Sequence, residues 1–325
     1  MTETLIGFVA LFTLLFLGLP IGFGMMVVGV TGFAWLVGWG PAFAMFGQLA
    51  FETPLSYNLS VLPLFLLMGN FIAKSRLSDD LYNLAYAFLG HRRGGLAMAT
   101  LAACGGFSAV CGSSLATAAT MAKVAIPSMR RFGYADSLAA GSIAAGGTLG
   151  ILIPPSTMLV LYGILTGTDI GALFIAGILP GILGIFLYIV AVGIVTTRNP
   201  ALGPPGERST ASERWRAIGR VWGVLLLFLW IMGGIYFGIF TPTEAAGMGA
   251  TGAFCFVLAR GNLTWRTLRD ILVETARTSA MMFIMLIGAL LFSNFINIAG
   301  LPTLLTGWLD SLQLQPMYIL VAILA

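Results

Sequence analysis

Charge is what this sequence has least of: only 9% of its 325 residues are Asp, Glu, Lys or Arg, whereas 58% are hydrophobic. A soluble domain normally carries about 25% charged residues. The chain is therefore expected to be an integral membrane protein. Because one spanning helix needs roughly 20 apolar residues, the apolar blocks predict about eight or nine spanning or half-spanning segments.

Cysteine and histidine are also scarce. Cys104, Cys111 and Cys255 lie inside apolar segments at no spacing typical of a metal site or a disulfide, and His91 is the only histidine. No paired acids, and no nucleophile with a nearby base, emerge from the segments. The sequence therefore argues against an enzyme, a bound cofactor or a nucleic-acid partner.

The basic residues occupy a restricted part of the chain, between Lys74 and Arg277. The positive-inside rule places clusters of Lys and Arg in the cytoplasm. Counting the apolar segments back from Lys74 gives three crossings, so the N-terminus is expected in the periplasm. The four clusters lie at 74–93, 130–131, 198–220 and 260–277.

The stretch between Arg93 and Arg130 departs from this pattern. It is too short for two crossings, which need roughly 40 residues plus a turn, and the Gly/Ser-rich run GGFSAVCGSSLATAATM (105–121) interrupts it. We expect a re-entrant hairpin of two half-helices at about 95–128 that opens to the cytoplasm. The later run GGTLGILIPPS predicts a broken helix at about 136–166, because proline lacks the N–H group that a helix needs.

The two halves of the chain resemble each other at a shift of 220 residues, which aligns Gly18 with Gly238 and Thr31 with Thr251. The first half begins outside and the second begins inside, so the similarity predicts an inverted repeat, an architecture common in secondary transporters. The expected division is a first repeat at 1–197, a cytoplasmic linker at 198–220 and a second repeat at 221–325.

Symmetry also predicts what should follow each repeat's spanning helices. The segments 75–93 and 300–316 both have apolar residues at helical spacing and are expected to be amphipathic helices at the membrane surface. A second hairpin should then open after Gln315. The sequence stops at Ala325, so the second repeat is expected to be incomplete.

The two interruptions are the candidate site, because irregular backbone inside a membrane is tolerated only within protein or beside a wet cavity. Freed carbonyl oxygens are hard ligands suited to Na⁺, and N–H groups at half-helix N-termini attract carboxylates. Helix packing through small residues remains the alternative for 139–147. The expected sodium ligands, through backbone oxygens or hydroxyls, are Gly112, Ser113, Ser114, Gly147, Thr148, Gly150, Pro154 and Pro155.

Three further polar residues are candidates for contact with a substrate: Ser108, Ser156 and Asn58. The Ser108 hydroxyl could equally satisfy a helix carbonyl, and the Asn58 amide could bond a neighbouring helix. Elsewhere, Asp169 and Thr243 are expected to cap helix N-termini.

The segment CGSSLATAATMAKVAIPSMRRFGY, together with IAAGGTLGILIPPSTMLVLYGILTG and GIFTPTEAAGMGA, resembles the large membrane subunit of tripartite ATP-independent periplasmic (TRAP) transporters, the dicarboxylate-permease type M subunit. The likeness covers essentially the whole chain. It implies an all-α, polytopic, elevator-type transporter in a bacterial inner membrane, similar to the wider ion-transporter superfamily. It also implies two partners, a small four-helix membrane subunit and a periplasmic substrate-binding protein.

On this resemblance the chain imports a small organic anion, such as a C4-dicarboxylate or a sugar acid like sialic acid, with Na⁺ as the coupling ion and no other cofactor. One sodium site would use Gly112, Ser113 and Ser114 with the break at 147–155, and a second would use the outer hairpin beyond Ala325. A stand-alone Na⁺/anion symporter without a binding protein is the alternative. A membrane scaffold without transport is the more distant one.

Overall fold

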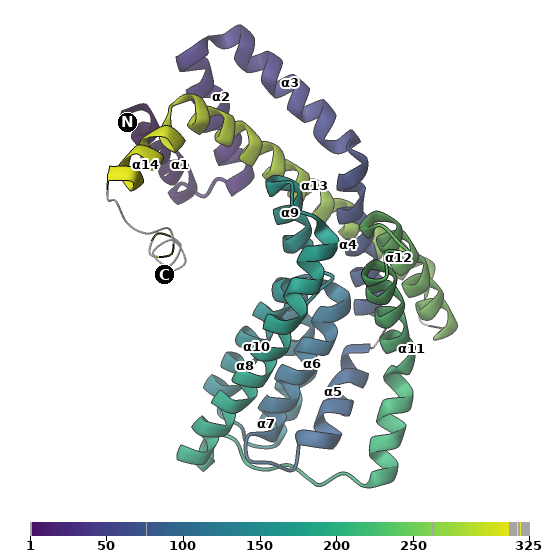
Figure 1. Ribbon diagram of the computed structural model, residues 1–325. Helices are drawn as coiled ribbons and strands as arrows, with labels where there is room; N and C mark the ends of the chain where they lie inside the picture. Colours follow the sequence, from purple (N-terminus) through teal and green to yellow (C-terminus); the bar gives the residue numbers. More distant parts are fainter. Residues whose placement is uncertain (1, 76, 262, 312–316, 318, 320–325) are drawn as a thin grey trace. The chain divides into compact units, whose positions relative to one another are not determined.

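Figure 1 shows a computed structural model of the chain, which describes all residues except 1, 76, 262, 312–316, 318 and 320–325. The described residues form helices and no strands, which confirms the all-α prediction. They divide into two compact units, Met1–Ser56 with Thr278–Ala325, and Tyr57–Arg277. Each unit therefore contains helices from both of the expected repeats.

The first unit is held together by close contact between α2 and the second half of α13. A methyl group on Gly29 would lie 2.6 Å from the carbonyl carbon of Leu291, and one on Gly22 would lie 2.9 Å from the Cα atom of Met285. Glycine at these positions lets the two backbones approach each other, as small residues do between membrane helices. The helices of this unit are α1 (Thr2–Phe16), α2 (Ile21–Val37), α3 (Trp39–Leu55), the end of α13 (Trp265–Ile298) and α14 (Leu301–Ser311).

The second unit is built around α6, which is buried along most of its length and packs against α4, α5, α7, α8 and α10. Gly146 of α8 lies so close to α6 that a methyl group there would be 2.5 Å from the Cys104 sulfur. The helices are η1 (Tyr57–Ser60), α4 (Val61–Lys74), α5 (Leu77–Leu89), α6 (Gly95–Cys111), α7 (Ser114–Arg131), α8 (Asp136–Leu152), α9 (Thr157–Thr166), α10 (Ile170–Arg198), η2 (Pro200–Leu202), α11 (Ala211–Tyr236) and α12 (Pro242–Ala259), followed by the start of α13.

Among the described residues, four helices are long and apolar enough to cross a membrane, and a fifth span is added if α8 and α9 are counted as one broken helix. The bend between α8 and α9 is 41°. The remaining apolar helices, among them α1, α2 and α6, are shorter. The expected segments are thus helical, and several of them are shorter than a full crossing. The four long candidates are Tyr57–Lys74, Ile170–Arg198, Ala211–Tyr236 and Trp265–Ile298.

Helix caps explain where two of the helices begin. Helix α11 starts at Ala211, inside the expected linker, because the Thr210 hydroxyl accepts the Glu213 N–H at 3.3 Å while the Glu213 carboxylate accepts the Thr210 N–H at 2.7 Å. This capping box satisfies N–H groups that the first helical turn leaves free. The same box at Thr241 and Glu244 begins α12.

The two caps predicted from sequence have different outcomes. The Asp169 carboxylate accepts the Ala172 N–H at 2.7 Å, so that prediction is confirmed. The prediction of Thr243 as a cap is wrong, because Thr241 is the capping residue. Glu244 stands three residues after Thr241, which is the spacing of a capping box, and Pro242 between them suits the first helical position.

Positions related by the shift of 220 residues have equivalent local structure. Gly18 and Gly238 both have a positive φ, 87° and 69°, just after a helix ends. The Thr31 hydroxyl donates to the Val27 carbonyl at 2.7 Å, and the Thr251 hydroxyl donates to the Gly247 carbonyl at 2.9 Å. The opposite orientation of the two repeats stays a prediction, and most of the segment after residue 315, where the second hairpin is expected to open, lies outside the described residues.

Candidate functional site

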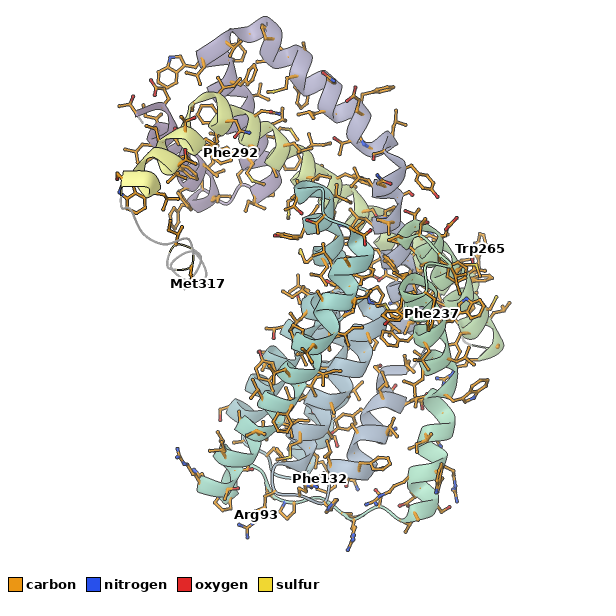
Figure 2. All side chains as sticks on the ribbon, viewed as in Figure 1. Arg93, Phe132, Phe237, Trp265, Phe292 and Met317 are labelled. Carbon is orange, nitrogen blue, oxygen red and sulfur yellow. The ribbon has the colours of Figure 1, made fainter. Side chains whose placement is uncertain are left out.

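Helices α6 and α7 form a helical hairpin with a two-residue turn. Gly112 ends α6 in the left-handed conformation with φ of 63°, which glycine adopts without strain, and its N–H donates to the Ser108 carbonyl at 3.1 Å. Ser113 is extended and caps α7, its hydroxyl accepting the Ala116 N–H at 3.4 Å. Figure 2 shows Arg93, just before α6, and Phe132, just after α7, at the same end of the unit.

The second interruption lies between α8 and α9. Ser156 caps α9: its hydroxyl accepts the Leu159 N–H at 3.5 Å and donates to the Ile151 carbonyl at 2.7 Å. Pro154 and Pro155 have no N–H to offer, so the carbonyls that end α8 lose their usual donors. The chain therefore changes direction between Leu152 and Thr157.

The two interruptions contact each other directly. Both the N–H and the hydroxyl of Thr157 donate to the carbonyl oxygen of Gly112, at 3.4 and 2.9 Å. A methyl group on Gly150 would lie 2.7 Å from the Ser113 oxygen, and one on Gly112 would lie 2.7 Å from the Pro155 oxygen. The turn of the hairpin, Gly112 and Ser113, thus packs directly against the break between α8 and α9. We call this arrangement the seated turn.

The structure brings most of the expected sodium ligands together. A methyl group on Gly147 would lie 3.3 Å from the Ser114 oxygen, so this glycine also faces α7. Thr148 faces elsewhere: its hydroxyl donates to the Ala145 carbonyl at 2.7 Å and lies 3.1 Å from the Tyr188 hydroxyl of α10. The Pro154 ring also lies on the α10 side, near Gly177.

The substrate candidates are dispersed. Ser108 is fully buried in α6, and its hydroxyl makes no hydrogen bond within the described part of the chain, so it does not satisfy a helix carbonyl. The Ser156 hydroxyl is occupied by its two helix contacts. Asn58 is exposed on η1. Of these three candidates, only Ser108 has a buried hydroxyl that remains unpaired within the described chain.

Two residues at the site were not predicted from sequence, Thr157 and Gly69. A methyl group on Gly69 of α4 would lie 2.7 Å from the Cys111 oxygen, so α4 closes the other side of the turn. The next residue, Asn70, donates to the Thr275 hydroxyl at 2.8 Å, which fixes this part of α4 against the start of α13. The only signal for Gly69 was its alignment with Gly288 at a shift of 219.

The contact region offers oxygen atoms and helix ends. The C-termini of α6 and α8 present carbonyl oxygens, which favour a cation, and the N-termini of α7 and α9 present N–H groups, which favour an anion. In the part of the chain that the structure describes, no three His, Cys, Asp or Glu side chains are grouped to hold a metal ion. A cation bound at this contact would therefore be held by neutral oxygens.

A cavity of about 450 Å³ runs along the exposed face of α7. It begins at Ala116, one turn after the hairpin turn, and extends to Val124. Two amines, Lys74 and Lys123, line it together with the carboxylates of Asp79 and Glu274. The other lining residues are Asn70, Ala73, Ser78, Ala119 and Thr120.

The sequence is similar to a known protein family and to several named proteins. A family model described as "Tripartite ATP-independent periplasmic transporter, DctM component" matches residues 8–325. The C4-dicarboxylate TRAP transporter large permease protein DctM of Pseudomonas aeruginosa is 38% identical over 275 residues, which are 83% of this chain and 64% of that protein. The corresponding protein of Rhodobacter capsulatus is 37% identical over 272 residues, 78% of this chain and 60% of that protein.

The sialic acid TRAP transporter large permease protein SiaM of Vibrio cholerae is 32% identical over 315 residues, 95% of this chain and 72% of that protein. The chain thus spans less than two thirds of the length of the two DctM relatives. Because the family model matches nearly the whole sequence, the chain belongs to the family of DctM components, the large permease proteins of TRAP transporters.

Proposed function

We propose that the chain is the large membrane subunit of a Na⁺-coupled secondary transporter that imports small organic anions across a bacterial inner membrane. The observation that best supports this proposal is the contact between two interruptions. The hairpin turn at Gly112 and Ser113 meets the break that precedes Thr157. Broken helices that meet in this way form the substrate and ion sites of many secondary transporters. In this proposal α6 and α7 are a re-entrant hairpin that moves with the site, as in an elevator.

The proposed Na⁺ site lies where the turn meets the break. Its ligands are backbone oxygens and hydroxyls of Gly112, Ser113 and Ser114, with backbone oxygens of the 147–155 segment. The Ser113 carbonyl accepts the Thr117 N–H at 3.0 Å and keeps a second lone pair for an ion, whereas the Gly112 carbonyl would have to exchange one of its two hydrogen bonds from Thr157 for the ion. An ion couples to transport only if it binds one conformation of the transporter better than another. We expect bound Na⁺ to favour the conformation in which the turn packs against the break.

The Ser113→Ala/Ser114→Ala variant is expected to need roughly tenfold more Na⁺ for half-maximal uptake, because it removes two hydroxyls of the proposed site; a tenfold change corresponds to about 1.4 kcal/mol of binding free energy. The complete transporter, reconstituted in vesicles, would be assayed for uptake over a range of Na⁺ concentrations.

Ser142→Ala is the matched control, since it removes a buried hydroxyl of α8 that only donates to the Ala139 carbonyl. Its Na⁺ dependence should equal that of the wild type. Unchanged sodium activation in the double variant would refute the proposed site.

The proposed substrate class is supported by the relatives' names and by the helix N-termini at the contact. Relatives are named as permeases for C4-dicarboxylate, sialic acid, ectoine and 2,3-diketo-L-gulonate. The N–H groups that begin α7 and α9 would attract a carboxylate, and Lys74 and Lys123 could pair with one only in competition with Asp79 and Glu274, which line the same cavity. Among the substrate candidates, the unpaired Ser108 hydroxyl is retained as a proposed contact.

The proposed partners are a small membrane subunit and a periplasmic binding protein that delivers the anion. Vesicles that contain the large subunit alone, with the small subunit, and with both partners would be compared for uptake. Uptake only with both partners supports the tripartite function. Uptake by the large subunit alone would instead favour a stand-alone symporter.

A further inference from the structure

A groove of about 400 Å³ lies between α5 and the first turns of α11. Asn83, Tyr86 and Ala87 of α5 form one wall, and the linker at 207–210 closes one end. The linker is fixed there, because the Tyr86 hydroxyl accepts the Glu207 N–H at 3.2 Å and the Gly90 carbonyl accepts the Gly206 N–H at 2.9 Å. We call this surface the basic groove.

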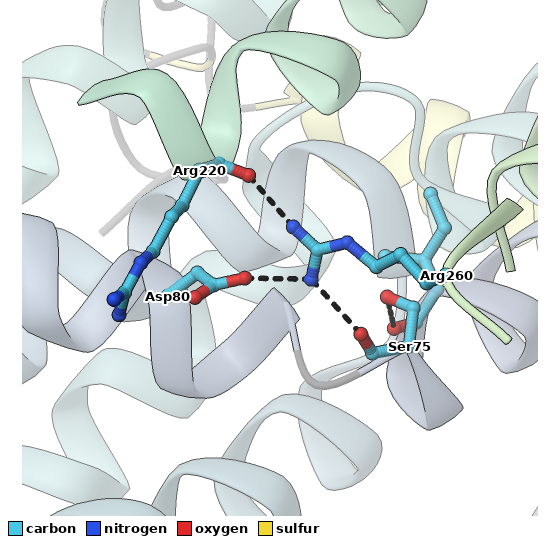
Figure 3. A network of polar contacts seen from close by, with 5 residues as sticks. Ser75, Asp80, Arg220 and Arg260 are labelled. Atoms are coloured by element: carbon cyan, nitrogen blue, oxygen red, sulfur yellow. Dashed lines mark hydrogen bonds and ion pairs between the residues drawn. The ribbon is translucent and has the colours of Figure 1, made fainter. Parts of the chain in front are cut away.

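Positive charge dominates the basic groove. Three guanidinium groups line it, those of Arg208, Arg216 and Arg220, and within the described chain none of them forms an ion pair. Figure 3 shows the Arg220 side chain directed away from Arg260, with only the Arg220 backbone oxygen engaged. The groove also contains two carboxylates, Glu207 and Glu213, which leaves a net charge of +1, and the Glu213 carboxylate is engaged by the cap of α11. The N-terminus of α11 adds further attraction for an anion.

An apolar groove of about 380 Å³ continues along α11 beyond Arg220. Because they are spaced alternately by four and three residues, Arg216, Arg220, Gly223, Leu227 and Trp230 share one face of α11. This face therefore passes from charged to apolar within a few turns. The apolar groove is lined by Gly223, Leu226, Leu227 and Trp230 of α11 and by Gly252 and Phe256 of α12.

Arg260 connects the two grooves. Its guanidinium donates to the Arg220 carbonyl at 2.7 Å and lies 4.6 Å from the centre of the Phe256 ring. Another face of α11, with residues spaced by seven, has the composition of a membrane boundary: Trp215 and Trp222 are 74% and 63% exposed, and Leu229 farther along α11 is 67% exposed. Tryptophan is enriched at the membrane–water interface, and exposed leucines beyond it face lipid.

We propose that these two grooves bind one anionic phospholipid, with its phosphate among Arg208, Arg216 and Arg220 and an acyl chain in the apolar groove. Basic pockets between helices at the cytoplasmic side are suited to anionic headgroups. The adjoining apolar groove selects a lipid over a free phosphate, because only a lipid fills both surfaces. The proposal requires membrane insertion and is independent of sodium coupling.

The test is lipid binding to the complete transporter, delipidated in detergent and measured by native mass spectrometry. The probes are dioleoyl phosphatidylglycerol, dioleoyl phosphatidylcholine and glycerol phosphate. Phosphatidylglycerol should bind more tightly than the other two. Arg208→Gln/Arg216→Gln/Arg220→Gln should weaken it about 100-fold, since each basic residue near the surface contributes about a fivefold gain.

The charge-matched control is Arg92→Gln/Arg93→Gln/Arg131→Gln, three exposed arginines outside both grooves. It should keep wild-type binding. Equal losses in both triple variants would show diffuse charge attraction and overturn the proposal. Glycerol phosphate binding as tightly as the lipid would identify a free-phosphate site instead. Cross-linking of the Ser209→Cys variant to the small subunit would show that a protein covers the groove, and would also overturn the proposal.

Discussion

Gly150→Ala is expected to reduce uptake to below a tenth of the wild-type rate and to destabilise the hairpin turn. The added methyl group would lie 2.7 Å from the Ser113 oxygen and 2.8 Å from the Ser114 nitrogen. Both are backbone atoms, so the clash cannot be relieved by a side-chain rotation, and the turn must move away from α8. Overpacking of this kind costs about 1–3 kcal/mol. Uptake in vesicles and the melting temperature in detergent would measure the two effects.

Gly141→Ala is the matched control, because Gly141 lies in the same helix and a methyl group there would meet no atom within 4 Å. Alanine is the better helix former, so this variant should be as stable as the wild type or more stable by up to about 1 kcal/mol. Normal uptake by Gly150→Ala would show that the close seating of the turn on α8 is not needed for transport.

Arg260→Ala is expected to lower the free energy of unfolding by about 3 kcal/mol, because removing one partner of a largely buried ion pair leaves the other charge uncompensated. The Arg260 guanidinium donates to the Asp80 carboxylate at 2.6 Å, to the Ser75 carbonyl at 3.1 Å and to the Arg220 carbonyl at 2.7 Å. Figure 3 shows these three contacts as dashed lines. These bonds join the end of α12 to α4, α5 and α11. The variant would leave the Asp80 carboxylate, 14% exposed, without its counter-ion. Thermal unfolding in detergent would measure the loss.

The second ion pair described provides the control. Arg130 and Asp136 lie 3.1 Å apart, but their side chains are 66% and 74% exposed. Exposed pairs contribute about 0–1 kcal/mol, so Arg130→Ala should change the melting temperature little. In Arg260→Ala/Asp80→Ala the two losses should be less than additive, because both remove one interaction. Additive losses, or equal losses in Arg130→Ala and Arg260→Ala, would contradict the assigned role.

The helices were predictable because their signals are local. The hairpin expected at about 95–128 became α6 and α7, and the break expected between 136 and 166 fell beside the two prolines. Hydropathy, Gly/Ser turns and proline act on neighbouring residues, so they can be recognised without a fold. The prediction at Thr243 was wrong because two threonines, Thr241 and Thr243, lie close to the start of α12. Only Thr241 stands three residues before Glu244, the spacing that a capping box requires.

The candidate site was predictable only in part. Charge placement and proline chemistry indicated the interruptions at 112–114 and 147–155, which the structure brings into contact. They did not indicate that the Thr148 hydroxyl turns towards Tyr188, or that Gly69 closes the turn from α4. The direction of a side chain depends on which helix packs against each face, and hydropathy does not specify this.

The role of Arg260 is a further feature that the sequence indicates only in part. In the sequence it is one of sixteen basic residues and marks only a side of the membrane. In the structure it joins the end of α12 to three other helices and lies where the basic groove meets the apolar groove. The sequence alone determined the membrane class, the helices and the two interruptions, since these follow from interactions within short segments. Only the tertiary structure shows that the hairpin turn packs against the break between α8 and α9 and that Arg260 joins four helices. Both features depend on contacts between residues far apart in the chain.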